Sequence, residues 1–392
     1  MMTKPTVTIL ARVFVTATAA VIATVGPAAA GHAESLTPVA NDSDLAVVTE
    51  GPRNFPWPDG SIVYSANTDT TPECCVPGTT TPPWTSEQVA GPGSIATGSA
   101  LAMARNSTGT VIAARGADNS LNTYWRIRNP SNTSWQWVRR QAALPGTTIS
   151  APSVARNGDT TVLAAQGTGN RLNFYWSPNN GLNWYPQMIT PDNTAFSAPS
   201  IADNGTATVI TVRGPANSLK FYWATNGTAN WHVTDPTATV DVANTYSAPA
   251  IAQDASNTVI TALGPGHSLN FYWATNGVAA WHANPVHGPT RDDDPAGTYS
   301  APSIAMTSTT AVIAALGWEN SLQFYWNIRG VPEWHPSPVT GTYSALTPPS
   351  IANNGTSTVI ATQSGYRNVG AYWVVNGTNT WHFEFVGHPY IP

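Results

Sequence analysis

The sequence predicts an all-β protein: a seven-bladed β-propeller with four antiparallel strands per blade. Three observations support this prediction. A pattern of about 50 residues recurs along the chain, which is typical of repeat architectures. Short runs of β-branched and aromatic residues alternate with turn residues, as in half-buried strands. Only 9% of the residues are charged, whereas 16 are Trp, so solvated helices are not expected.

The repeat is clearest between Ser197 and Trp231, where it opens with Ser-Ala-Pro-Ser-Ile-Ala and closes with Trp-His. Six copies are plain, and a degenerate seventh fits the region from Ser35 to Trp84. A lone blade cannot bury both of its faces, so neighbouring copies must cover them. A closed ring is favoured over a linear solenoid because no polar terminal cap is visible. The predicted repeats cover residues 35–98, 99–149, 150–196, 197–246, 247–299, 300–343 and 344–392.

Each repeat offers four strand candidates, and Asn-Gly dipeptides at 226–227, 276–277 and 376–377 predict hairpin turns. The third candidate strand ends in adjacent Tyr and Trp residues. Neighbours on a strand point to opposite faces, so these pairs are interpreted as packing between blades. The pairs are Tyr175/Trp176, Tyr222/Trp223, Tyr272/Trp273, Tyr325/Trp326 and Tyr372/Trp373.

Residues 1–33 resemble a secretory signal peptide, with Lys4 and Arg12 near an apolar run and small residues after it. Cleavage is expected near Ala30 or Ala33, which leaves residues 34–392 as a secreted, extracellular propeller. An uncleaved anchor is the alternative, but the apolar run is short for a membrane span. No other stretch predicts a membrane span.

Cys74 and Cys75 are the only cysteines, and they are adjacent. An exported chain meets an oxidising compartment, so a vicinal disulfide is one prediction and a rigid loop tip is the other.

No motif of a known catalytic, phosphate-binding or dinucleotide-binding site occurs, and we expect no cofactor and no metal site. The net charge of −5 and the absence of a basic patch argue against nucleic acid as a partner. The only acidic cluster, 292–294, lies in a Pro/Gly-rich linker and is interpreted as a loop that is solvated or touches a cation.

Two family resemblances accompany the repeat. The segment from Ser177 to Trp184, Ser-Pro-Asn-Asn-Gly-Leu-Asn-Trp, resembles the Asp-box of sialidases with Asn179 in place of Asp, and it implies a hairpin turn away from catalysis. Arg115-Gly-Ala-Asp-Asn-Ser-Leu121 and the surrounding repeat are similar to the seven-bladed lectins of the Photorhabdus type. That resemblance implies pockets between blades that bind fucose or O-methylated sugars.

The closing Trp-His pairs are the best candidates for sugar binding, because an aromatic face and a polar neighbour suit the C–H and hydroxyl groups of a sugar. An alternative interpretation is that these Trp residues only fix the outer strand to its blade. The candidate residues are Trp184, Trp231, His232, Trp281, His282, Trp334, His335, Trp381 and His382.

The sequence therefore predicts a secreted, multivalent, non-catalytic carbohydrate-binding protein whose partners are glycans or glycoconjugates. Several weak sites on one rigid ring would give avidity. Two other hypotheses stay open. One is a sialidase-like glycoside hydrolase or lyase with a single axial site, and the other is a protein-interaction platform that uses the Cys74-Cys75 loop.

Overall fold

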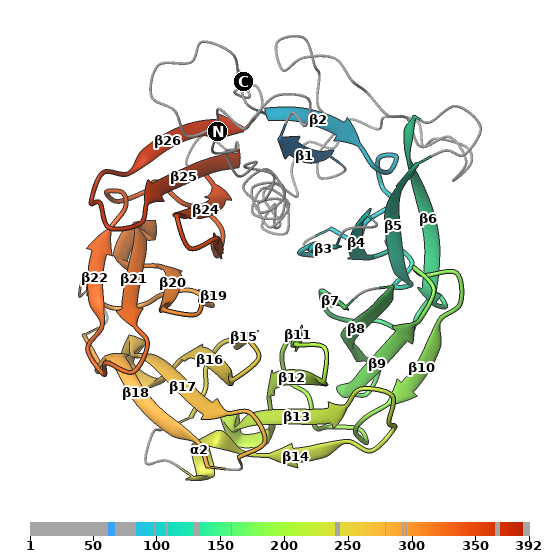
Figure 1. Ribbon diagram of the computed structural model, residues 1–392, viewed down its shortest axis with the longest axis horizontal. Helices are drawn as coiled ribbons and strands as arrows, with labels where there is room; N and C mark the ends of the chain where they lie inside the picture. Colours follow the sequence, from blue (N-terminus) through green and yellow to red (C-terminus); the bar gives the residue numbers. More distant parts are fainter. Residues whose placement is uncertain are drawn as a thin grey trace, which may run out of the picture.

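The computed structural model describes residues 62–66, 84–97, 99–106, 109–128, 134–157, 159–239, 244–278, 280–291, 294, 296–364 and 369–386. These residues form six four-stranded antiparallel sheets and one two-stranded sheet. The four-stranded sheets are arranged like blades around a central axis (Figure 1). Each strand pairs with the next one in the sequence, as in a propeller.

The blades are numbered 1 to 6 in chain order. Their innermost strands are β3 (Ala102–Asn106), β7 (Ser153–Asn157), β11 (Ser200–Asp203), β15 (Ala250–Gln253), β19 (Ser303–Met306) and β23 (Ser350–Asn353). The second strands are β4 (Gly109–Arg115), β8 (Thr160–Gly167), β12 (Ala207–Arg213), β16 (Asn257–Leu263), β20 (Thr310–Leu316) and β24 (Ser357–Gln363). The third strands are β5 (Leu121–Arg128), β9 (Arg171–Ser177), β13 (Leu219–Thr225), β17 (Leu269–Thr275), β21 (Leu322–Ile328) and β25 (Val369–Val375). The outermost strands are β6 (Trp135–Ala143), β10 (Tyr185–Met188), β14 (His232–Thr234), β18 (His282–His287), β22 (His335–Pro338) and β26 (His382–Val386).

The hydrophobic core lies between blades. On β12 of blade 3, Val209 packs into the cluster shared with blade 4, whereas its neighbour Ile210 packs into the cluster shared with blade 2. Adjacent residues of a strand point to opposite faces, so a sheet covered on both faces needs a continuous apolar run. This requirement explains the Thr-Val-Ile-Thr-Val sequence of β12.

A side-chain hydrogen bond also joins neighbouring inner strands. The backbone N–H of Ile201 donates to Ser153 Oγ of the preceding blade at 3.1 Å. Ile251 and Ile351 donate in the same way to Ser200 and Ser303. The Ser of the Pro-Ser-x-Ala motif therefore links one blade to the next.

The predicted propeller with four antiparallel strands per blade is confirmed, but the predicted number of seven blades is wrong. The described part of the copy assigned to residues 35–98 is a two-stranded sheet of β1 (Ile62–Ala66) and β2 (Trp84–Gln88), in which Ala66 pairs with Trp84. Figure 1 shows these strands between β26 and β6. The segment Ile-Val-Tyr-Ser-Ala of β1 lacks the Phe-Tyr-Trp run with which most third strands pack against their neighbours.

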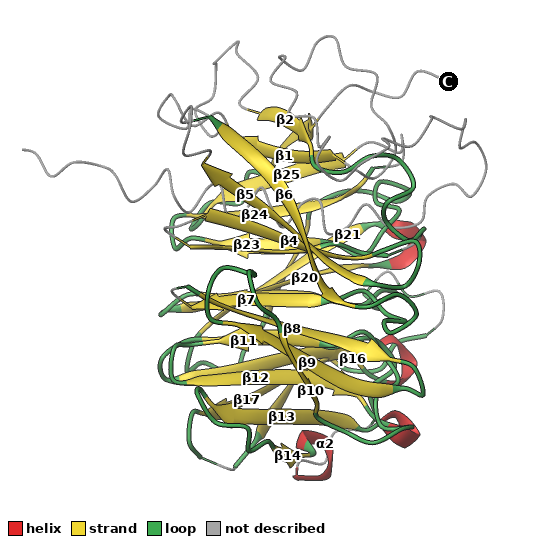
Figure 2. Ribbon diagram, turned by 90° about the vertical axis from the view of Figure 1, so that its right-hand side faces the viewer, coloured by secondary structure: helices red, strands yellow, loops and turns green. Residues whose placement is uncertain are grey.

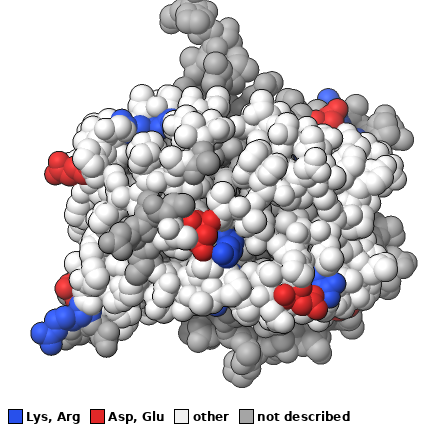
Figure 3. Space-filling model, turned by 90° about the horizontal axis from the view of Figure 1, so that it is seen from below, with Lys and Arg blue, Asp and Glu red and all other residues white. Residues whose placement is uncertain are grey.

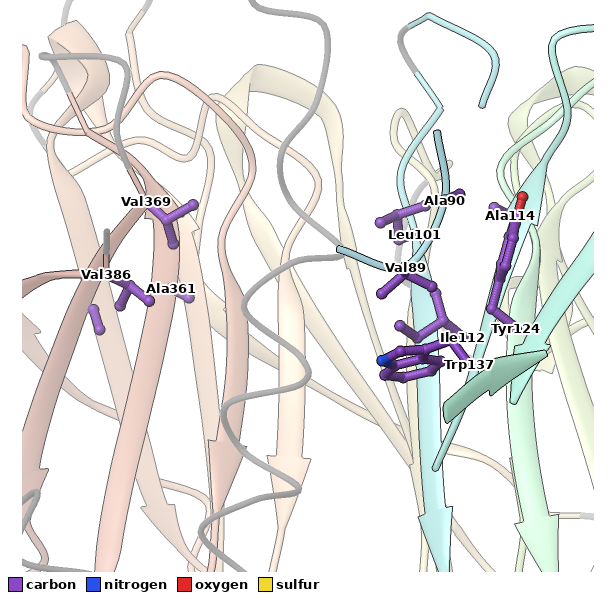
Figure 4. Packing of buried hydrophobic residues seen from close by; sticks show 11 residues of the cluster. Val89, Ala90, Leu101, Ile112, Ala114, Tyr124, Trp137, Ala361, Val369 and Val386 are labelled. Carbon is purple, nitrogen blue, oxygen red and sulfur yellow. The ribbon is translucent and has the colours of Figure 1, made fainter. Parts of the chain in front are cut away.

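The junction between the last and first blades is accordingly irregular. One buried cluster contains residues from both sides of this junction. Val89, Leu101 and Trp137 belong to the blade 1 side, and Val369 and Val386 belong to blade 6. Figure 4 shows these two groups on the two sides of the junction.

Short helical turns lie on one side of the ring (Figure 2). They are η3 (Pro215–Asn217), α2 (Pro236–Thr239), η4 (Pro265–His267) and η5 (Trp318–Asn320). No helix within the described ranges has the length and apolar character needed to cross a membrane. Figure 3 shows that the charged groups on the lower side of the ring form a few small clusters on a largely uncharged surface.

Candidate functional site

The closing Trp residues pack between blades. Each ring meets a Phe of the preceding blade edge-on, with centroids 4.8 to 5.0 Å apart, a favourable geometry for aromatic pairs. The pairs are Trp231 with Phe174, Trp281 with Phe221, Trp334 with Phe271, and Trp381 with Phe324. In blade 1 the position of this Phe is held by Thr123, and Trp184 packs against the core between blades 1 and 2 instead.

The His residues of the Trp-His pairs lie elsewhere. His232, His282, His335 and His382 stack on the Trp of the third strand in their own blade, namely Trp223, Trp273, Trp326 and Trp373. Trp334 points back to blade 4 and His335 stacks within blade 5, so a Trp-His pair does not form one site. The structure instead groups the Trp–His stack of one blade with the closing Trp of the next.

The Tyr-Trp pairs divide in a similar way. All five Tyr residues are buried in the cores between blades, which confirms the interpretation for them. The five Trp residues are only partly buried, and Trp176 is 38% exposed. Their outer faces carry the stacked His or, for Trp176, Tyr185.

One of these groupings encloses a cavity of about 460 Å³ between blades 4 and 5, here named cleft 4/5. Blade 4 contributes Phe271, Trp273 and Asn284, while blade 5 contributes Trp334 and the turn at Arg329. The complete lining is Asn257, Val259, Phe271, Trp273, Asn284, Ser308, Ala311, Asn327, Arg329, Gly330, Val331, Pro332 and Trp334. A mostly apolar wall with a few polar groups is typical of small-molecule sites.

The polar groups of cleft 4/5 are incompletely paired. Trp334 is only 8% exposed, and its indole N–H is buried without a hydrogen-bond partner. The Asn284 side chain makes no hydrogen bond to any described residue. A buried donor without an acceptor costs about 1–3 kcal/mol, so this arrangement favours a ligand or water that accepts from it.

Arg329 crosses from blade 5 to blade 4 at the rim of the cleft. Its Nη1 forms an ion pair with the Asp254 carboxylate and donates to the carbonyl oxygen of Thr307 at 3.0 Å. Burial alone would raise the pKa of the Asp254 carboxyl, but backbone N–H groups of Asn257 and Ser256 and the Arg329 guanidinium hold that pKa below its ordinary value. The rim therefore carries a fixed, ionised pair.

The equivalent interface between blades 2 and 3, cleft 2/3, is bridged by a side chain of the protein itself. The Trp231 indole N–H donates to Gln187 Oε1 at 3.2 Å, and Gln187 Nε2 donates to the carbonyl oxygen of Ala229 at 2.9 Å. Both partners belong to blade 3, so the Gln187 side chain bridges the cleft.

The interface between blades 1 and 2 is filled by two guanidinium groups. Arg140 and Arg156 lie over the Trp125 ring, with their Cζ atoms 5.5 and 5.0 Å from its centroid. Both donate to Asn180, and Arg156 also donates to the Gly109 carbonyl at 2.7 Å. Burial lowers the pKa of Arg156 to about 10, with the nearby Asp159 opposing this shift.

Asn180 belongs to the turn that resembles an Asp-box. Within it, Gly181 N–H donates to Ser177 Oγ at 2.8 Å and Asn183 N–H donates to Asn179 Oδ1 at 3.0 Å. The motif is the hairpin turn between β9 and β10, and it packs on Trp125, where a Cβ on Gly181 would come within 2.5 Å of the ring. It closes an interface and carries no reactive group.

Three contributors to these clefts were missed by the sequence analysis: Asn284, Gln187 and Arg329. Asn284 and Gln187 hold the same place, since each pairs with the Phe two residues before the third-strand Trp. Blades 3 and 5 have Thr234 and Ser337 there. Arg329-Gly330 replaces the Asn-Gly turn of blades 3, 4 and 6, and this departure from the repeat was visible in the sequence.

Within the described ranges, no three His, Cys, Asp or Glu side chains gather at one place where a metal ion could bind. The Cys74-Cys75 prediction and residues 292 and 293 of the acidic cluster lie outside the described residues, as do residues 1–33.

No protein-family model and no curated protein sequence matches this chain. Its fold is similar to that of solved lectins. A lectin from Burkholderia pseudomallei aligns with a TM-score of 0.59 at 17% identity, covering 72% of this chain and 82% of that one. The SapL1 lectin, solved with alpha methyl fucoside, aligns at 0.52 and 10% identity over 76% and 99% of the two chains. An Aleuria aurantia lectin mutant, solved with Fucalpha1-6GlcNAc, aligns at 0.50 and 10% identity over 76% and 98%.

Proposed function

We propose that the protein is a non-catalytic lectin that binds neutral monosaccharide units of glycans in the clefts between blades. The observation that carries this proposal is cleft 4/5, where a partly exposed and a buried Trp line one cavity together with amide and guanidinium groups. Aromatic faces suit the C–H face of a sugar, and the unpaired Trp334 N–H and Asn284 amide suit its hydroxyls.

Fucose is the sugar to test first. The propeller lectins with this fold include proteins solved with fucosides, and the sequence resemblance points to fucose or O-methylated sugars. The methyl group of a 6-deoxy sugar would fit the apolar wall formed by Val259, Ala311 and Val331.

More than one cleft supports binding in this proposal. The interfaces 3/4 and 5/6 have the same aromatic pairs and the short side chains Thr234 and Ser337 where Gln187 closes cleft 2/3. Three sites on one rigid ring would bind clustered glycans with avidity.

We also propose secretion, because residues 1–33 have the pattern of a signal peptide.

The test is a calorimetric titration with methyl α-L-fucoside, preceded by a glycan array, on the wild type and on Trp273→Ala. Loss of the Trp273 ring is expected to weaken binding at cleft 4/5 severalfold, up to about tenfold, since aromatic stacking contacts contribute about 0.5–1.5 kcal/mol. Trp176→Ala is the matched control, because it removes the same residue beside the filled cleft 2/3 and is expected to leave binding unchanged. A folded wild type that binds no sugar on the array or in the titration would contradict the proposal.

A further inference from the structure

At one position, cleft 2/3 and cleft 4/5 differ by a single methylene group. Gln187 pairs with Phe174 on the third strand of blade 2, and Asn284 pairs with Phe271 at the same place in blade 4. The longer Gln187 side chain reaches blade 3 and makes two hydrogen bonds there. The shorter Asn284 side chain makes no hydrogen bond to any described residue, and it lines a cavity of about 460 Å³.

The same indole N–H is satisfied in one cleft and unsatisfied in the other. Trp231 donates to Gln187 Oε1, whereas its equivalent Trp334 is buried without an acceptor. Both Trp residues meet a Phe of the preceding blade at 4.9 Å, so the surrounding packing is alike. The two clefts therefore share this aromatic pair and differ in the acceptor that the indole N–H meets.

The aromatic wall of cleft 2/3 is also in place. Trp176 is 38% exposed and stacks on Tyr185 at 4.6 Å, as Trp273 stacks on His282 at 4.1 Å. Every element of cleft 4/5 that we assign to stacking thus has a counterpart beside Gln187.

We propose that cleft 2/3 is a latent sugar-binding site that the Gln187 side chain closes by occupying the place of a ligand. This inference rests on the proposed function. The two hydrogen bonds of Gln187 indicate which groups a ligand in the open cleft must have. It needs an acceptor for the indole N–H of the closing Trp. Close to that acceptor it needs a donor for the backbone carbonyl of the residue two positions before this Trp. That residue is Ala229 in cleft 2/3 and Pro332 in cleft 4/5. Adjacent hydroxyls of a neutral pyranose provide both groups.

The test counts bound sugars. Methyl α-L-fucoside is titrated into the wild type, Gln187→Ser and Asn284→Gln, and the number bound per chain is measured by native mass spectrometry and calorimetry. Gln187→Ser gives blade 2 the residue that blade 5 has, and it is expected to add one bound sugar. Asn284→Gln is expected to remove one. Met188→Ser on the same strand is the control, because Met188 points to the opposite face and should leave the number unchanged.

An unchanged number in Gln187→Ser, with the variant folded and the wild type binding, would overturn the inference while the proposed function stands. A wild type that binds no sugar would refute the proposed function. In that case, whether Gln187 closes cleft 2/3 is tested by measuring the hydrogen exchange of the Trp231 indole N–H by NMR. Slower exchange in the wild type than in Gln187→Ser would support closure of the cleft by Gln187, and equal exchange would overturn it.

Discussion

The Trp of the third strand is buried in the interface between blades 1 and 2, whereas the equivalent Trp is partly exposed in cleft 4/5. Trp125 is 2% exposed, lies beneath Arg140 and Arg156, and donates from its indole N–H to Thr123 at 3.0 Å. Trp273, its counterpart in blade 4, is only partly buried and lines an open cavity. One repeat position therefore belongs to the core of one interface and to the wall of an open cavity in another.

The turn between the third and outermost strands of the following blade determines whether this Trp is covered or lines a cavity. In blade 2, the turn with Asn180 and Gly181 lies against Trp125 and accepts hydrogen bonds from both arginines. In blade 5, the turn carries Arg329, which reaches to Asp254 at the rim and leaves the cleft open. The difference shows that departures from the repeat, and not the repeat itself, distinguish an interface with a cavity from one that is closed by arginine side chains.

The largest expected effect is at Trp125. Trp125→Ala should lower the free energy of unfolding by about 4 kcal/mol, because it leaves a large cavity beneath two guanidinium groups. Trp273→Ala should cost about 2 kcal/mol, because part of its surface already faces the cleft. Urea denaturation of both variants measures the difference. Equal losses would contradict the distinction between a filled interface and an open one.

Removal of Arg156 should have the next largest effect. Arg156→Ala deletes hydrogen bonds to Gly109 and Asn180 and a cation held 5.0 Å from the Trp125 ring. A loss of about 3 kcal/mol in unfolding free energy is expected. Arg171→Ala is the control, since its ion pair with Asp192 is largely exposed and should contribute less than about 0.5 kcal/mol. Similar losses in the two variants would show that the guanidinium group of Arg156 does not hold the interface.

The ion pair at the rim of cleft 4/5 should give a smaller, pH-dependent effect. The pKa of Asp254 in the folded protein lies below its ordinary value, so its carboxylate stabilises the fold above about pH 4, and this contribution is lost as the pH falls through the folded-state pKa. Asp254→Asn should lower the unfolding free energy by about 1 kcal/mol at pH 7. Denaturation at pH 7 and pH 3 checks the sign, because the difference between the two proteins should become smaller at the lower pH. A difference that is the same at both values would contradict the assignment.

The sequence predicted the blades because the repeat positions are buried between them. Val209, Ile210 and Tyr222 recur at fixed steps, and each is held by contacts that any neighbouring blade provides. The number of blades could not be predicted in the same way, because the copy at 35–98 matched the pattern only in short separate pieces and its described part forms two strands.

The clefts were only partly predictable. The Trp-His pairs were singled out, yet the alternation of side chains along a strand places Trp334 and His335 on opposite faces, an outcome that the strand period implies. Gln187, Asn284 and Arg329 could not be assigned from one sequence, because their roles depend on how far a side chain reaches across to the next blade.

A crystal structure of the protein with methyl α-L-fucoside would show where the sugar binds. We expect the sugar in cleft 4/5, stacked on Trp273 and accepting from the Trp334 indole N–H, with cleft 2/3 still occupied by Gln187. Sugar in cleft 2/3, or sugar bound only away from the clefts, would contradict this expectation.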